Sequence, residues 1–94
     1  MDIPDLQHPV LSLARYLQDH PRACDSAPGI SLWWFPPTDA PSEIDVLNAL
    51  DWMVEHGFMK RAVAGDGRVS YARADGEADL LGRVGLALAG IGRR

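Results

Sequence analysis

The sequence predicts a small, mostly helical α+β fold. Apolar residues recur at helical spacing in several stretches of the chain, and these stretches are bounded by residues typical of helix ends. Two short segments with alternating apolar and polar side chains surround an Asp-Gly pair, which is typical of a β-hairpin. The chain has 94 residues, 47% hydrophobic and 23% charged, so it is suited to one modest core. We therefore expect a single domain over residues 1–94.

The first helix is expected from Pro9 to about His20, after an N-terminal arm of residues 1–8. Its apolar residues follow the i, i+3, i+4, i+7 pattern of one buried face: Val10, Leu13, Ala14 and Leu17. A proline in the first turn needs no amide hydrogen, and Pro21 disfavours helical geometry in the residue before it. This pattern predicts an amphipathic helix.

A second, short helix is expected from Asp25, as the capping residue, to about Phe35. Its second half is apolar on every side: Ile30, Leu32, Trp33, Trp34 and Phe35. Consecutive helical residues point about 100° apart, so these side chains cannot all face one core. We expect one tryptophan in the core and at least one large aromatic side chain at the surface. The sequence leaves open whether Trp33 or Trp34 is the exposed one.

The third helix has the strongest signal, with Ser42 as its cap and Gly57 as a left-handed residue after its end. The stripe expected to face the core is Ile44, Leu47, Leu50 and Val54, broadened by Val46, Ala49 and Met53. The outer face is then acidic and polar: Glu43, Asp45, Asn48, Asp51 and Glu55. Trp52 lies between the two and is a candidate for extending an aromatic surface outward.

A hairpin is expected next, with strands over 58–63 and 68–73 around the turn 64–67. A final helical segment over 75–92 places four apolar residues on one stripe: Leu80, Val84, Leu88 and Ile91. Two interpretations of this stripe remain open. It covers the domain's own core, or it pairs with a second copy in a homodimer.

Charge is distributed unevenly along the chain. Residues 1–58 contain nine acidic and two basic side chains, whereas residues 59–94 contain seven basic and four acidic ones. The net charge is -4 and the pI is near 5.1, whereas domains that bind polyanions generally have a pI above about 9. A general nucleic-acid binder is therefore not expected, and the asymmetry indicates separate acidic and basic faces.

The usual catalytic and cofactor motifs are absent from the sequence. It contains no phosphate-binding loop, dinucleotide fingerprint, metalloprotease motif, paired-cysteine motif or nucleophile elbow, so we expect neither an enzyme nor a cofactor. His20, Cys24 and Asp25 are spaced as three candidate metal ligands, but Pro21 breaks the helix that would align them, and no metal site is expected.

Cys24 is the single cysteine, and the first residues lack the basic and apolar regions of a secretory signal. We therefore expect a cytoplasmic protein. The longest apolar stretch, over 84–92, is far shorter than the roughly 20 residues of a spanning helix, so no membrane association is expected.

The order of these elements resembles a winged helix-turn-helix domain. The segment MVEHGFMKR, followed by AVAGDGRVSYAR, is similar to the end of the third helix and the wing in bacterial regulators of the MarR and GntR kind. The resemblance covers about residues 9–73 and implies three helices with a β-hairpin wing. By analogy of fold, it also implies DNA binding through the third helix.

The acidic outer face of the third helix departs from that expectation, because each carboxylate near phosphate meets like charge. The first hypothesis is a non-enzymatic module that binds a protein partner through the third helix and the tryptophan-rich second helix. Its candidate residues are Trp33, Trp34, Asp45, Asp51, Trp52 and Glu55. The alternative is a small, dimeric transcriptional regulator that binds DNA with its wing. Its candidate residues are Asn48, Lys60, Arg61, Arg68 and Arg73.

Overall fold

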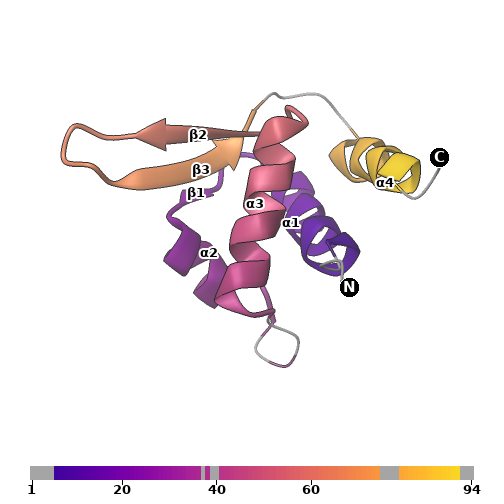
Figure 1. Ribbon diagram of the computed structural model, residues 1–94, viewed down its shortest axis with the longest axis horizontal. Helices are drawn as coiled ribbons and strands as arrows, with labels where there is room; N and C mark the ends of the chain where they lie inside the picture. The colour runs from indigo at the N-terminus through magenta and orange to yellow at the C-terminus, as the bar shows by residue number, and fades with distance from the viewer. Residues whose placement is uncertain (1–5, 37, 39–40, 75–78, 92–94) are drawn as a thin grey trace.

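The computed structural model describes residues 6–36, 38, 41–74 and 79–91. Within them the fold is α+β, with four helices and one three-stranded antiparallel sheet (Figure 1). The elements, in chain order, are α1 (Gln7–Asp19), β1 (Cys24–Asp25), α2 (Ala27–Trp33), α3 (Glu43–Glu55), β2 (Met59–Val63), β3 (Val69–Arg73) and α4 (Leu80–Ile91). One cluster of buried apolar side chains includes residues from all four helices and from β2 and β3.

Helix α1 confirms the predicted apolar face. Val10, Leu13, Ala14 and Leu17 are all fully buried. The helix begins at Gln7, two residues before the expected start, so Pro9 lies in its first turn and is buried. Residues 1–5 of the expected N-terminal arm lie outside the described part of the chain.

Helix α4 packs against α1, as Figure 1 shows at one end of the molecule. Its residues Leu80, Val84 and Leu88 are buried in the same core. In the structure this stripe covers the domain's own core, which was the first of the two interpretations. These three side chains are therefore not available for a homodimer interface, and the side chain of Ile91 lies outside the description. The expected helix start at residue 75 lies outside the described residues, within which α4 begins at Leu80.

Helix α2 is capped by Ser26 rather than by Asp25, so the predicted cap is wrong by one residue. The Ser26 side chain accepts a hydrogen bond from the Gly29 amide at 3.2 Å. Asp25 belongs to strand β1, and its carboxylate accepts from the Ser26 amide at 2.8 Å. The helix ends at Trp33, two residues before the predicted end.

Helix α3 has the predicted Ser42 cap, whose side chain accepts from the Asp45 amide, but its buried face is rotated. The buried residues are Val46, Ala49, Leu50, Trp52 and Met53, whereas Ile44 and Leu47 are exposed. Positions three apart in a helix differ by about 60° in direction, so a stripe built from steps of three drifts around the axis. Residues 46, 49, 50 and 53 keep the i, i+3, i+4, i+7 spacing that one face requires.

The sheet has the order β1-β3-β2, with the predicted hairpin formed by β2 and β3. The amide of Gly67 donates to the Ala64 carbonyl at 2.9 Å, and Gly67 has a φ of +89°. Gly57 has a φ of +80°, as predicted for the residue that ends α3. Strand β1 was not predicted, because two residues are too few to show an alternating pattern.

Candidate interaction surface

A groove lies between α2, α3 and the hairpin, with a volume of about 870 Å³. We call it the α2–α3–hairpin groove. Its lining residues are Asp25, Ser26, Ala27, Pro28, Leu47, Arg61, Val63, Arg68, Val69, Ser70 and Tyr71. Figure 1 shows the hairpin projecting beyond the helices, with α2 and α3 on the same side of it.

Apolar side chains are exposed in and near this groove. Leu47 and Val63 line it with 41% and 66% of their surfaces exposed, and Ile44 lies one turn before Leu47 on α3 at 69%. The composition of α3 is a sequence signal for this surface. Eight of the thirteen residues of α3 are apolar, which is more than one buried face accommodates.

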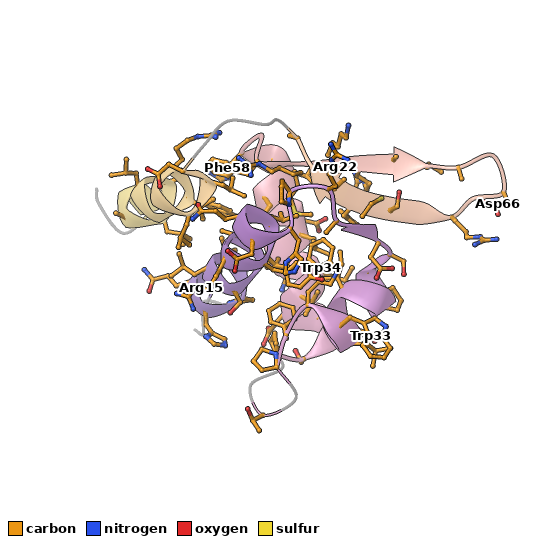
Figure 2. All side chains as sticks on the ribbon, turned by 180° about the vertical axis from the view of Figure 1, so that it is seen from behind. Arg15, Arg22, Trp33, Trp34, Phe58 and Asp66 are labelled. Carbon is orange, nitrogen blue, oxygen red and sulfur yellow. The ribbon has the colours of Figure 1, made fainter. Side chains whose placement is uncertain are left out.

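The two adjacent tryptophans of the second helix have opposite surroundings. Trp34 is 6% exposed and stacks on Tyr16, with ring centroids 4.6 Å apart. Trp33 is 72% exposed at the end of α2, where Leu32 is also exposed. Figure 2 shows Trp34 within the body of the molecule and Trp33 on the outer side of α2. The prediction of one buried tryptophan is confirmed, and the exposed aromatic candidate is Trp33. The prediction of Trp34 as a partner-binding residue is wrong, because its ring is buried against Tyr16.

Trp52 is only 7% exposed, so its prediction as part of an exposed aromatic surface is wrong. Its ring stacks on His56 at 4.0 Å and lies 6.0 Å from the ring of Phe58. The cause is the rotation of α3, which turns position 52 inward and positions 44 and 47 outward.

The acidic candidates on α3 do not form one uniform face. Asp51 and Glu55 are exposed, as is Glu43, whereas Asp45 is half-buried. Asp51 lies 3.7 Å from Arg61 of β2, and about half of each side chain is exposed. This ion pair joins the acidic helix to the basic hairpin, so part of the predicted charge separation is neutralised within the molecule.

The cations proposed for DNA binding differ in their surroundings, and Arg68 has 87% of its side chain exposed. Arg61 faces Asp51, and Arg68 donates to Asp66 at 2.9 Å. Arg73 is half-buried, and its Nε and Nη2 atoms are shielded from solvent without a hydrogen-bond partner among the described residues. Lys60 is exposed, and no ion pair involves it in the described part of the chain. Asn48, the proposed base-reading residue, is half-buried.

A second, smaller cavity of about 460 Å³ lies on the outer side of α1. Its lining residues are His8, Leu11, Ser12, Arg15, Tyr16, Asp19, His20, Trp34 and Pro36. Tyr16 is stacked on both sides, by Trp34 and by His20 at 4.3 Å. Because both faces of this ring are already covered by neighbours, the cavity presents little free aromatic surface.

Among the residues with described positions, no three His, Cys, Asp or Glu side chains lie close enough to hold a metal ion. No described helix combines the length and apolar composition needed to cross a membrane. Comparisons with protein-family models, with curated proteins and with solved structures found no match to this chain.

Proposed function

We propose that the chain is a winged-helix domain that works as a non-enzymatic interaction module, with the α2–α3–hairpin groove as its binding surface for a protein partner. The element order supports the winged helix: three helices precede a β-hairpin, and the third helix ends at a left-handed glycine directly before it. The short strand β1, between the first two helices, pairs with β3 of the hairpin and joins the hairpin to the helical part of the domain.

The exposed apolar residues of the groove are the observation that carries the protein-binding proposal. In a DNA-binding winged helix, the outer side of the third helix presents donors to bases and phosphates. Here the corresponding helix presents Leu47 to the groove and Ile44 beside it, and the hairpin adds Val63. Exposed apolar side chains gathered at a concave surface are typical of protein interfaces, where their removal from water favours association.

The charged residues around the groove further favour a protein over a polyanion. Arg61 and Arg68 each face a carboxylate of this chain, and Asp25 is also among the lining residues. A phosphate backbone brought to this surface would have to compete for those two arginines and would meet the carboxylate of Asp25. A mixed apolar and charged rim suits the side chains of a protein segment.

The substitution Leu47→Glu tests the proposal, with Leu86→Glu as its matched control. Both leucines are exposed, but Leu86 is on α4, away from the groove, at 77% exposure. Both variants should fold normally by circular dichroism, because exposed substitutions usually change stability by no more than about 0.5 kcal/mol. In quantitative affinity capture from the source cells, the partner should be retained by wild type and Leu86→Glu and lost by Leu47→Glu. Equal capture by all three proteins contradicts the groove as the binding surface.

DNA binding by the hairpin remains the alternative, and the same proteins test it. A gel shift that is weakened on all sequences by Arg61→Ala and Arg68→Ala, and altered in base preference by Asn48→Ala, would support it. Under our proposal, no specific shift is expected. Reversal of Asp45 and Asp51 to lysine should then strengthen any non-specific DNA association, because repulsion near phosphate becomes attraction.

A further inference from the structure

Strand β2 is an edge of the sheet, and its hydrogen-bonding pattern follows from the hairpin register. The register pairs Arg61 with Tyr71 and Val63 with Val69. The residue pairs just beyond the two ends of β2 are hydrogen-bonded. The Ala64 amide donates to the Arg68 carbonyl, and the Ala74 amide donates to the Phe58 carbonyl. Antiparallel pairs alternate between bonded and non-bonded ones. Arg61 and Val63 therefore occupy non-bonded pairs, and their amides and carbonyls point away from β3.

These outward groups have no strand beside them in the described residues, because the sheet order β1-β3-β2 leaves β2 at one side. Figure 1 shows β2 along the outer border of the hairpin, away from α2. On the other side of β3, the corresponding groups of Tyr71 face Asp25 of β1. An edge with free amides and carbonyls is a template for a further strand.

The charge of this edge selects the kind of segment that fits it. Strand β2, which forms this edge, contains Lys60 and Arg61 and no acidic residue, and Arg61 lies 3.7 Å from Asp51 of α3. Lys60 is exposed on β2 and has no ion-pair partner in the part of the chain that the structure describes. Opposite charges across neighbouring strands stabilise pairing, and like charges directly opposite destabilise it. An acidic segment is therefore favoured, whereas a second copy aligned on Arg61 places two arginines opposite each other.

We infer that β2 receives an extended acidic segment of the protein partner as a fourth strand, held by the outward backbone groups of Arg61 and Val63. This inference rests on the proposed function and specifies how the partner is recognised. Residues directly opposite each other in neighbouring strands share a face. The side chains opposite Arg61 and Val63 thus lie on the face of the sheet that lines the α2–α3–hairpin groove.

A synthetic peptide of alternating glutamate and valine, about ten residues long, is the probe. In the free protein, the amides of Lys60 and Ala62 should exchange slowly with solvent and those of Arg61 and Val63 quickly, as resolved by NMR. Addition of the peptide should slow exchange at Arg61 and Val63. Two further peptides are N-methylated at alternate amides, one at each of the two complementary sets of positions. One of them should bind at least about tenfold more weakly, because its methyl groups remove several backbone hydrogen bonds.

The substitution Val63→Pro removes one outward amide without removing a bond of the hairpin, since that amide does not bond to β3. Val63→Pro should weaken binding of the peptide at least about tenfold. The control Val63→Thr, which keeps the amide, should weaken peptide binding less. Lys60→Glu should also weaken binding of the peptide, and this effect should be larger at low salt. If Val63→Pro fails to fold, the N-methylated peptides decide the matter in the wild-type protein.

Several outcomes overturn the inference. They are unchanged exchange at Arg61 and Val63 with the peptide present, equal binding of both N-methylated frames, and a salt-independent effect of Lys60→Glu. Concentration-dependent dimerisation of the free protein, with slowed exchange at Val63, assigns the edge to a second copy instead and also overturns it. Failure of the proposed function is distinguishable, because Leu47→Glu then leaves partner capture unchanged. Loss of capture by Leu47→Glu with full capture by Val63→Pro keeps the groove and rejects the added strand.

Discussion

Helices α1 and α3 are both thirteen residues long and pack against each other, yet they use their apolar residues differently. In α1 one stripe is buried, and the outer side includes polar and charged residues such as Arg15, Gln18 and Asp19. In α3 one stripe is buried, and a second apolar stretch with Ile44 and Leu47 remains at the surface. The apolar face of α1 is accounted for by the fold, whereas α3 carries apolar surface that the fold does not bury. That excess makes α3 the helix with a candidate binding function.

The largest effects expected from substitution test this difference directly. Leu13→Ala in α1 and Leu50→Ala in α3 should each destabilise the protein by about 2 to 5 kcal/mol, because both side chains are fully buried. Leu47→Ala should cost no more than about 0.5 kcal/mol, because that side chain is exposed. Urea unfolding of the three variants provides the measurement. A cost for Leu47→Ala similar to that for Leu50→Ala would mean that α3 is oriented differently from the structure.

The two helices also end differently, which gives the next largest effect. α1 ends at Asp19 shortly before Pro21, whereas α3 ends through Gly57 at a φ of +80°. Gly57→Val should destabilise by more than about 1 kcal/mol, because a branched side chain disfavours this backbone conformation even where space is open. Gly65→Ala is the control, since Gly65 has no positive φ and open space around it. Equal melting temperatures of the two variants would contradict the left-handed conformation assigned to Gly57.

The beginnings of the two helices predict a smaller difference. Ser42 caps α3 with its side chain, whereas Leu6 at the start of α1 makes no side-chain capping bond. Ser42→Ala should cost about 1 kcal/mol, because one amide at the start of α3 loses its acceptor. Ser42→Asp should restore most of the loss, since aspartate is an equally good capping residue. Chemical denaturation of both variants measures this, and equal stability of Ser42→Ala and wild type is the contrary result.

The smallest expected effect concerns the ion pair that joins α3 to the hairpin. Asp51 and Arg61 are 3.7 Å apart and about half exposed, so solvent screens their attraction. A double-mutant cycle with Asp51→Asn and Arg61→Gln should give a coupling free energy of no more than about 0.5 kcal/mol, decreasing with added salt. A coupling several times larger that does not respond to salt would indicate that the pair is structurally important. No comparable pair links α1 to the sheet among the described residues.

Local sequence features predicted much of the fold because each depends on a few neighbouring residues. The spacing of Val10, Leu13, Ala14 and Leu17 predicted the buried face of α1, and the turn before Gly67 predicted the hairpin. Ser42 and Gly57 predicted the two ends of α3. The cap of α2 was missed by one residue because Asp25 and Ser26 both have acceptor side chains, and only the pairing of Asp25 with Tyr71 in the sheet separates them.

The candidate site was harder to predict, because it depends on which apolar residues the core leaves out. Trp33 and Trp34 are adjacent and chemically identical, so no local pattern distinguishes the exposed one from the buried one. The stacking of Trp34 on Tyr16 of α1 decides it. Likewise, α3 has apolar residues in two directions, and its contacts with α1, α2 and β2 select the side that is buried.

The sequence by itself determined the four helical segments, the hairpin, the left-handed glycine and the uneven charge, because helix periodicity, backbone preference and side-chain ionisation are properties of short stretches. Only the tertiary structure decided the face of α3 that is buried, the exposed tryptophan, the pairing of Asp51 with Arg61 and the position of β2 at one side of the sheet. Burial, ion pairing and strand order depend on residues far apart in the chain. The apolar groove is therefore a product of packing, formed from side chains that the core did not cover.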